Sequence, residues 1–341
     1  MERDLSANAF SSPLGRSGGA LKIGIIGAAG YTAGELIRLL LNHPQAEIVF
    51  ANSSSNAGNK LYDVHEGLLG ETEMTFTDAL PYEQIDVLFF CSAHGDTKKF
   101  LETNEVPSSL KIIDLSTDYR HKAEGNDFVY GLPELNKEAI RKASKIANPG
   151  CFATAIQLGL LPLANAGLLK DDVHVNAITG STGAGVKPGA TSHFSWRENN
   201  ISVYKPFGHQ HLKEIGESVT QLQPDFAYEI QFLPVRGNFT RGIFASIYTQ
   251  FDGTQEEAEK LYKEFYADSA FTIVTDKNPD LKQVVNTNKC LLHVEKHGNK
   301  LLIISCIDNL LKGASGQAVH NLNLLFGLEE TTGLKLKAAA F

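Results

Sequence analysis

The chain has 341 residues, 43% of them hydrophobic and 21% charged, and its 31 Lys and Arg against 39 Asp and Glu residues give a formal net charge of −8. This length and composition are typical of a globular protein with two domains, or with one domain and a large insertion, and they exclude a small disulfide-stapled scaffold. Because the chain is acidic and has no run of Lys or Arg, we expect a small-molecule partner, and neither nucleic acid nor a membrane.

Cysteine usage and the N-terminal sequence bear on the compartment. There is no CxxC pair and no apolar signal sequence, so we predict a cytoplasmic protein with reduced thiols. Residues 1–21 are rich in Ser and Gly and carry both charge signs, which predicts a disordered extension or tail. The longest apolar stretch, residues 151–169, contains Gln157, Pro162 and Asn165. We therefore predict a buried helix that ends near Pro162 instead of a membrane span.

From Lys22 onward, short apolar strands alternate with helical patterns. KIGIIG is a strand that runs into glycines, residues 31–42 have apolar side chains at helical spacing, and a strand follows at residues 48–51. This strand–helix–strand order predicts a parallel sheet. The pattern continues with a strand at 87–91, a helix at 97–103 and a strand at 112–115. We therefore predict a doubly wound, Rossmann-like α/β domain over residues 22–150.

After residue 147 the strands become longer and alternate more clearly between apolar and polar residues. They are predicted at residues 173–179, 228–232, 243–251, 290–295 and 301–307. Some follow one another without a helix, which predicts a mixed, mainly antiparallel sheet in an α+β catalytic and oligomerisation domain over residues 151–310. A last helix, over residues 314–326, is expected to pack back on the first domain, which residues 311–328 would complete.

A glycine turn ends the first strand and opens the first helix. Glycine lets the backbone approach a pyrophosphate, which then lies against helix N–H groups. The spacing is GxxGxxGxxxG instead of GxGxxG, and a tight turn needs glycine in any case, but the position at the first βα turn favours a dinucleotide site. The residues that we expect to hold the cofactor here are Gly27, Ala29, Gly30, Tyr31 and Thr32.

The end of the next strand bears on which cofactor binds. An NAD-specific site usually carries an acid there for the ribose hydroxyls, and none is present. Ser53 and Ser55, with Lys60 just beyond them, suit a 2′-phosphate, so we predict NADP(H). The alternative is a Ser-rich loop without a ligand.

The segment Asn148-Pro149-Gly150-Cys151 is the most informative one. Its Pro and Gly make a turn that places Cys151 at the start of a helix, where free N–H groups and the helix dipole stabilise a thiolate. This context predicts that Cys151 is a nucleophile. The other three cysteines, Cys91, Cys290 and Cys306, lie in apolar strand runs and are predicted to be core residues.

A thiolate nucleophile needs an acid/base partner, and His209 and His211 follow a Pro/Gly loop. Glu214 lies three residues after His211, on the same face if a helix begins there, so its carboxylate could orient an imidazole. A metal site built from the two histidines is the weaker alternative because no third ligand lies nearby, and we predict none.

Two arginines and a lysine lie in glycine-rich or turn contexts: Arg236, Arg241 and Lys187. Arginine offers a planar fork to a carboxylate or phosphate. A solvated surface position is the alternative for Arg236, and it suits Arg241 less well because Arg241 begins an apolar strand.

A set of segments resembles the N-acetyl-γ-glutamyl-phosphate reductase family over residues 22–328. In chain order they are GAAGYTAGELIRLL from Gly27, DLSTDYR from Asp114, YGLPELN from Tyr130, IANPGCFATAIQLGLLP from Ile146, GSTGAGVKPG from Gly180, GHQHLKEI from Gly208, TRGI from Thr240 and DNLLKGASGQAVHNLNLLFG from Asp308. The more distant aspartate-semialdehyde dehydrogenases share the architecture and the cysteine but not the whole set.

The resemblance implies NADPH-dependent reduction of an N-acyl-γ-glutamyl phosphate to the semialdehyde, with release of phosphate. Cys151 would form a thioester, His211 or His209 would move protons, and Glu214 would orient one of them. The chain would be a homodimer or homotetramer. Further cofactor contacts are implied for Ser92, Ser181, Gly183 and Asn309, and substrate contacts for Arg120 and Arg241.

One segment departs from the family, which reads roughly PHL where this chain has Pro234-Val235-Arg236. We hypothesise that Arg236 reads an extra negative charge and selects a succinyl in place of an acetyl group, whereas neutral drift is the alternative. Aspartyl or aminoadipyl phosphate reduction and a catalytically silent NADP-binding sensor are the other candidate functions.

Overall fold

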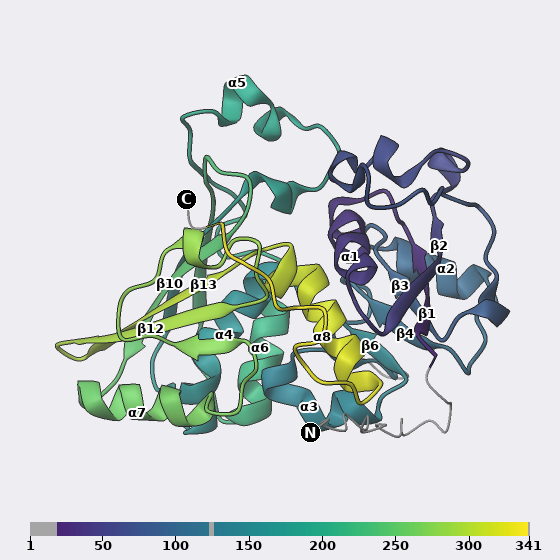
Figure 1. Cartoon of the computed structure of the whole chain (residues 1–341). Coiled ribbons are helices and arrows are strands. Elements are labelled where there is room, and N and C mark those ends of the chain that lie inside the picture. Colours follow the sequence, from purple (N-terminus) through teal and green to yellow (C-terminus); the bar gives the residue numbers. More distant parts are fainter. Residues whose placement is uncertain (1–18, 123–125, 340–341) are drawn as a thin grey trace, which may run out of the picture.

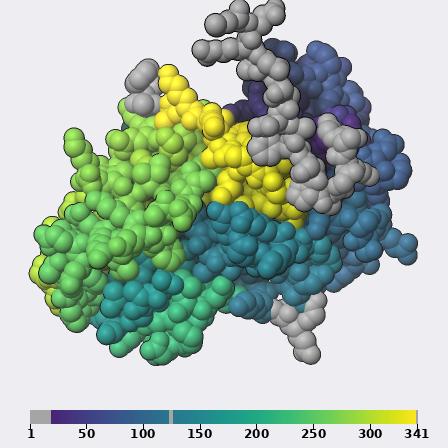
Figure 2. Space-filling view, turned by 60° about the horizontal axis from the view of Figure 1, so that its bottom comes forward, coloured from purple at the N-terminus to yellow at the C-terminus, as the bar shows by residue number. Residues whose placement is uncertain are grey.

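A computed structural model describes residues 19–122 and 126–339 and shows two halves, each built around a β-sheet (Figure 1). The tail expected over residues 1–21 lies outside the described residues except for its last three, and the first strand begins at Leu21. The halves meet along the C-terminal part of the chain, drawn in yellow, which lies between them in Figure 2 as well.

The first half contains a six-stranded sheet in which all strands are parallel, in the order β2-β1-β3-β4-β6-β5. The strands are β1 (Leu21–Ile26), β2 (Ala46–Asn52), β3 (Val87–Phe90), β4 (Lys111–Asp114), β5 (Val129–Tyr130) and β6 (Lys145–Ala147). Its helices are α1 (Tyr31–Leu41), α2 (Asp96–Thr103) and α3 (Pro133–Lys142). The doubly wound prediction is confirmed. The order reverses between β1 and β3, so the binding crevice lies at the carboxyl ends of these strands.

The second half contains a seven-stranded sheet in the order β11-β12-β13-β10-β7-β9-β8. The strands are β7 (Val173–Thr179), β8 (Ser202–Val203), β9 (Ile230–Arg236), β10 (Ile243–Gln250), β11 (Thr272–Val274), β12 (Cys290–His297) and β13 (Lys300–Ile307). Two of its pairings are parallel, β7 with β9 and β11 with β12, and the others are antiparallel. The prediction of a mixed, mainly antiparallel sheet is confirmed.

Helices α4 (Cys151–Asn165), α6 (His211–Leu222) and α7 (Gln255–Phe265) pack on one face of the second sheet (Figure 1). The short helix α5 (Phe194–Arg197) lies on an excursion away from the sheet. Along β10, Ile243, Ala245 and Ile247 are fully buried against these helices, and Tyr248 on the opposite face is exposed. This alternation follows from the period of two in a strand.

Helix α4 does not end near Pro162, so that prediction was wrong. The helix continues to Asn165 with Pro162 inside it. A proline removes the hydrogen bond to the carbonyl four residues earlier, here Leu158. The hydroxyl of Tyr266, which lies 108 residues later in the sequence, donates to that carbonyl at 2.5 Å. The freed acceptor is therefore satisfied in the core, and the helix tolerates the proline.

The last helix, α8 (Gly316–Leu325), follows a single π-helical turn, η8 (Leu311–Ser315). Helix α8 packs against α1 and α3 of the first half, so the C-terminal chain returns to the domain in which it began. Turn η8 lies between the two halves and contacts α4 and α1. The predicted single helix over residues 314–326 is therefore two elements.

Candidate active site

Cys151 is the first residue of α4 and follows β6 by three residues, so it lies where the carboxyl edge of the first sheet meets the second half. No side chain caps this helix, and the backbone N–H groups of Cys151 and Phe152 act on the thiol. Burial raises the pKa of Cys151 more than these N–H groups and Arg120 lower it. The pKa is therefore above its ordinary value, and the expected thiolate requires a base that removes the proton.

Two buried histidines lie beside the start of α4. The backbone N–H of His211 donates to His209 Nδ1 at 3.2 Å, which puts the proton of neutral His209 on Nε2. A Cβ placed on Gly150 would lie 2.4 Å from His211 Nε2, so this ring nitrogen faces the backbone next to Cys151. Burial lowers the pKa of His211 to about 3 and that of His209 to about 4. Both rings are neutral at pH 7 and can accept a proton.

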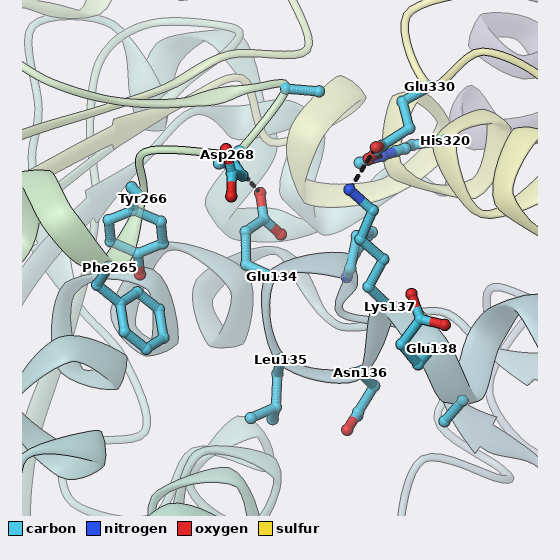
Figure 3. Close-up of a pocket in the computed structure, with 14 residues that line it drawn as sticks. Glu134, Leu135, Asn136, Lys137, Glu138, Phe265, Tyr266, Asp268, His320 and Glu330 are labelled. Carbon is cyan, nitrogen blue, oxygen red and sulfur yellow. Dashed lines mark hydrogen bonds and ion pairs between the residues drawn. The ribbon is translucent and has the colours of Figure 1, made fainter.

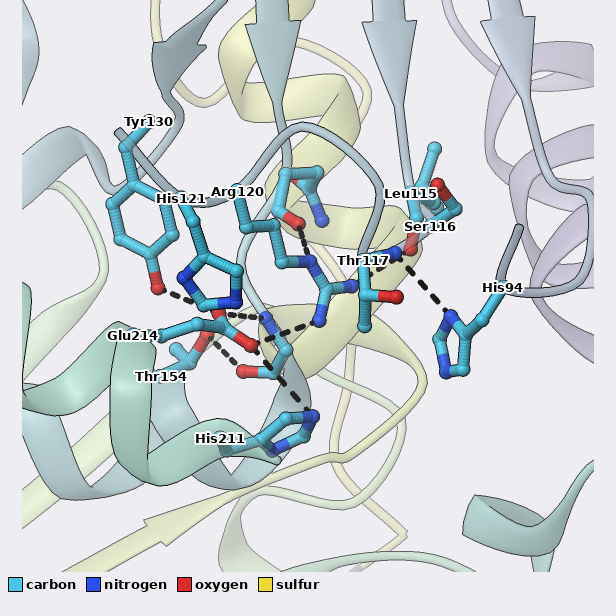
Figure 4. Close-up of polar contacts among 12 residues, drawn as sticks. His94, Leu115, Ser116, Thr117, Arg120, His121, Tyr130, Thr154, His211 and Glu214 are labelled. Atoms are coloured by element: carbon cyan, nitrogen blue, oxygen red, sulfur yellow. Dashed lines mark hydrogen bonds and ion pairs between the residues drawn. The ribbon is translucent and has the colours of Figure 1, made fainter. Parts of the chain in front are cut away.

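Glu214 is the centre of a buried polar network (Figure 4). Its Oε1 accepts from Arg120 Nη1 at 3.1 Å and lies 3.9 Å from His211 Nε2. Its Oε2 accepts from the Tyr130 hydroxyl at 2.9 Å and from the Gly150 N–H at 3.0 Å. Burial raises the pKa of Glu214, but the Arg120 guanidinium and the other donors outweigh this and lower it to about 2. Glu214 is therefore ionised and ties the histidine to the turn before Cys151.

Arg120 is held by protein groups on every side. Its Nε donates to the Asn148 carbonyl and its Nη2 to the Leu115 carbonyl, both at 2.8 Å. Only 6% of the residue is exposed. The substrate contact expected for Arg120 stays a prediction, since what the structure describes is a buried partner of Glu214.

Arg241 pairs with two carboxylates. Its Nη1 lies 2.8 Å from Glu35 Oε1, on α1 in the first half, and its Nη2 lies 3.0 Å from Asp308 Oδ2. The arginine therefore joins the two halves of the molecule, and its charge is already balanced. The substrate role expected for Arg241 stays a prediction that this pairing does not favour.

Arg236 has different surroundings. Its guanidinium stacks on Tyr204 at 4.8 Å and donates to the Ser181 carbonyl at 3.3 Å. Among the residues that the structure describes, no carboxylate forms an ion pair with Arg236. The Arg236 guanidinium also contributes to the lowered pKa of His209. Lys187, the third cation singled out by its context, has an exposed side chain.

The predicted glycine turn lies between β1 and α1 and has the geometry that a dinucleotide needs. Gly27 has φ +73°, and a Cβ on it would lie 2.8 Å from the Ser92 backbone nitrogen, so only glycine fits this close approach. Gly30 precedes α1 and no side chain caps the helix, which leaves N–H groups of its first turn free for a phosphate. The turn therefore brings Gly27, Gly30 and Ser92 together, next to Ala29, Tyr31 and Thr32.

The loop after β2 contains the serines for which a cofactor role stays a prediction. The hydroxyls of Ser53 and Ser55 lie 3.4 Å apart, and Asn56 Nδ2 donates to both. Lys60 instead binds Glu73, with Nζ 3.1 Å from the carboxylate and 2.8 Å from the carbonyl. Its charge is therefore balanced by a neighbouring loop.

On the other side of the crevice, Asn309 Nδ2 donates to Thr182 Oγ1 at 3.0 Å and stabilises the turn that contains Ser181 and Gly183.

Sequence reasoning missed four residues at the site: His94, Tyr130, Asn148 and Gly313. The exposed His94 accepts at Nδ1 from the Thr117 N–H at 3.3 Å, and desolvation together with the Arg120 guanidinium lowers its pKa (Figure 4). A polar residue just after β3, beside the strand-order reversal, is the signal that could have found His94. Tyr130 and Asn148 stood in motifs already quoted, but only the fold shows their contacts.

Two family models match the chain: the semialdehyde dehydrogenase NAD binding domain over residues 22–143, and the semialdehyde dehydrogenase dimerisation domain over residues 151–309. The class defined by this fold and this cysteine site is therefore the semialdehyde dehydrogenases. A solved structure of aspartate semialdehyde dehydrogenase II from Vibrio cholerae, complexed with ASA, has a TM-score of 0.71 at 16% identity and covers 90% of this chain and 98% of its own. The Candida albicans aspartate semialdehyde dehydrogenase with NADP has a TM-score of 0.69, also at 16% identity, with the same coverage.

A relative from Phocaeicola vulgatus is much more similar. It is 68% identical over 321 residues, covers 94% of this chain and 100% of its own length, and is named N-acetyl-gamma-glutamyl-phosphate reductase. The chain belongs to the N-acetyl-gamma-glutamyl-phosphate reductase family. The resemblance found in the sequence is thus confirmed. Within residues 19–122 and 126–339, no helix has the length and apolar character needed to cross a membrane.

Acid is expected to destabilise the protein through its buried histidines. The pKa of His211 is about 3 in the folded chain against an ordinary value of 6.5. As the pH falls below 6.5, the unfolded chain binds a proton that the folded chain does not, which lowers the free energy of unfolding by about 1.4 kcal/mol per pH unit. Urea unfolding is measured at several pH values between 6.5 and 4. The free energy of unfolding of His211→Gln is expected to fall with decreasing pH less steeply than that of the wild type, by that amount. An unchanged slope would contradict a buried, neutral His211.

Proposed function

We propose that this chain reduces N-acetyl-γ-glutamyl phosphate to N-acetylglutamate 5-semialdehyde with a nicotinamide cofactor, and that Cys151 carries the acyl group as a thioester. The observation that supports this most is the position of Cys151. It begins α4 at the edge of a doubly wound sheet, beside the linked His211, Glu214 and Arg120, in a chain of the reductase family. A silent sensor would need the glycine turn but not this buried network.

In the proposed mechanism, His211 accepts the Cys151 proton because its own ring is neutral. The sulfur attacks the γ-carbonyl carbon, a C–S bond forms, the C–O bond to phosphate breaks, and phosphate leaves. A nicotinamide cofactor held at the glycine turn would supply the hydride that reduces the thioester. The C–S bond then breaks, the aldehyde leaves, and His211 returns the proton to sulfur. Glu214 holds His211 and the Gly150 N–H throughout, and His209 is the proposed second ring in the proton path.

The residues around the first βα turn fit a dinucleotide, and we propose NADP(H). The glycine turn would hold the pyrophosphate, and the hydroxyls of Ser53 and Ser55 with Asn56 would hold the 2′-phosphate. No acid stands at the end of β2 to bind free ribose hydroxyls. Lys60 contributes less than the sequence suggested, because Glu73 already balances its charge.

The direct test of the proposed function is a steady-state assay of cofactor oxidation with N-acetyl-γ-glutamyl, aspartyl and aminoadipyl phosphates, each with NADPH and NADH. The proposal expects the highest kcat/KM for the N-acyl-γ-glutamyl substrate with NADPH. Turnover of only one of the other two phosphates would assign the chain to a related reductase. No turnover of any would favour the sensor.

Arg236 favours a second candidate, N-succinyl-γ-glutamyl phosphate, for the reason that its charge has no carboxylate partner among the described residues. If a succinyl carboxylate binds Arg236, Arg236→Ala is expected to lower kcat/KM for the succinyl substrate by about tenfold and to leave the acetyl substrate within about twofold. Arg197→Ala is the control, because Arg197 contacts the Arg236 backbone carbonyl and donates only to protein oxygens. Equal losses for both substrates would reject the succinyl hypothesis.

We further propose that the chain acts as a homodimer or homotetramer in the cytoplasm. The match to a dimerisation domain supports association of the second half, and the exposed Tyr248 on β10 offers an aromatic contact to a second copy. All four cysteines are free thiols, as a reducing compartment requires. Sedimentation equilibrium at micromolar concentration would distinguish these two states from a monomer.

A further inference from the structure

The nucleophile is covered by the π-helical turn η8. A Cβ placed on Gly313, in the middle of this turn, would lie 2.8 Å from Cys151 Cβ and 3.1 Å from Cys151 Cα. The backbone of η8 therefore rests directly on the start of α4, and a shift of the turn would move or uncover the sulfur. Single π-turns are uncommon and occur mainly at functional sites.

The same turn connects the nucleophile to the cofactor turn. The Ala314 carbonyl accepts from Asn148 Nδ2 at 3.0 Å, three residues before Cys151. The Ser315 hydroxyl donates to the Thr32 carbonyl at 2.7 Å, in the first turn of α1. The position of η8 thus fixes the nucleophile turn and the glycine turn relative to each other.

A buried ion pair ties η8 to α3. Lys312 Nζ lies 2.7 Å from Glu134 Oε1, and the two side chains are 0% and 3% exposed. The Thr272 hydroxyl also donates to Glu134 Oε1, at 2.7 Å. Burial raises the pKa of Glu134, but Lys312 and His320 outweigh this and lower it, so the carboxylate stays ionised. A buried charge is costly without its partner, so Glu134 restrains Lys312 strongly.

Glu134 also forms part of the wall of a cavity of about 400 Å³, across which His320 and Glu330 lie (Figure 3). Helix α3 is kinked beside it, since Asn136 has non-helical φ and ψ. Glu134 Oε2 has no hydrogen-bond partner among the described residues. Glu134 therefore has space on its cavity side, and the conservative variant Glu134→Gln is expected to fold.

We propose that the Lys312–Glu134 pair is a positioning device for the reaction: it holds η8 against Cys151 and so sets where the sulfur stands relative to the cofactor turn. Neither residue contacts the reacting atoms. This inference rests on the proposed role of Cys151, and it assigns to the buried pair a function in turnover beyond its contribution to stability.

The test compares Glu134→Gln, Lys312→Met and the combined variant with Tyr262→Phe. Tyr262 is a fully buried residue whose hydroxyl bonds the Gly159 carbonyl, so its variant also loses stability but leaves η8 alone. Each single variant is expected to lose about tenfold in kcat, with KM for the acyl phosphate within about twofold. The combined variant removes both charges, so its Tm is expected to recover while kcat stays low. If kcat recovered together with Tm, or if Tyr262→Phe lost as much turnover, the pair would be only structural.

A second measurement does not need turnover. The rate of Cys151 alkylation by iodoacetamide is expected to change in Glu134→Gln, Lys312→Met and the combined variant, because these variants shift the turn η8 that lies over the sulfur. The rate in Tyr262→Phe is expected to match that of the wild type. Unchanged alkylation in all three would overturn the positioning role. Turnover that persisted in Cys151→Ser would instead reject the proposed function, whatever the alkylation rates showed.

Discussion

Cys151→Ser is expected to lower kcat/KM for the acyl phosphate by about 10³-fold or more, with little change in substrate binding. A serine hydroxyl fits the same space, so the fold is kept, but it is a far weaker acid than a thiol. Among the residues that the structure describes, the bases beside it are histidines whose pKa values are about 3 and 4. An alcohol is ionised far less than a thiol beside the same weak bases, so an acyl-enzyme is expected to form much more slowly.

Mass spectrometry gives the direct readout of this prediction. Wild-type protein incubated with acyl phosphate and no reduced cofactor is expected to gain one acyl group on Cys151, and Cys151→Ser none. Cys290→Ser is the matched control, because Cys290 is fully buried in β12 and burial raises its pKa to about 12. Phosphate-dependent oxidation of the semialdehyde by Cys151→Ser would overturn the nucleophile assignment.

The order of strands, turns and helices could be predicted because each element is specified by residues that are close together in the sequence. KIGIIG followed by glycines specifies β1 and the turn to α1, and the NPGC segment specifies where α4 begins. The five longer strands of the second sheet were also predicted to within a few residues, because their alternation is local. The short strands β8 and β11 were not predicted. Residues that share one turn or one helix face, such as His211 and Glu214, were brought together correctly for the same reason.

Contacts between distant segments could not be predicted from these patterns. Helix α4 continues past Pro162 because Tyr266, far along the sequence, bonds the freed carbonyl. Arg241 pairs with Glu35, 206 residues away, which no local rule shows. The pKa of Cys151 is likewise decided by its burial, whereas the sequence shows only the helix start that acts in the opposite direction. Each error arose where tertiary structure supplies a partner or removes water.

Glu214→Gln is the second variant with a large expected effect, because it leaves the buried Arg120 without its counter-ion while keeping the side-chain shape. Removing one partner of a buried ion pair typically costs about 3–5 kcal/mol of unfolding free energy. Turnover is expected to fall as well, by about 10²-fold, since His211 loses its carboxylate and the amide has only one oxygen for the donors of Arg120, Tyr130 and Gly150. Urea unfolding at pH 7 and steady-state kinetics on the same preparation measure the two effects.

Glu217→Gln is the control for this variant, since Glu217 lies three residues later on α6 and forms a half-exposed pair with His121. It is expected to change stability by less than about 1 kcal/mol and turnover little. Glu214→Asp separates the two roles of the carboxylate: it keeps the charge beside Arg120 but shortens the reach to Gly150. We expect Glu214→Asp to have a higher free energy of unfolding than Glu214→Gln but a turnover that is equally low. If Glu214→Asp regained both in proportion, the carboxylate would serve only to balance Arg120, and the orientation of His211 would have to come from another group.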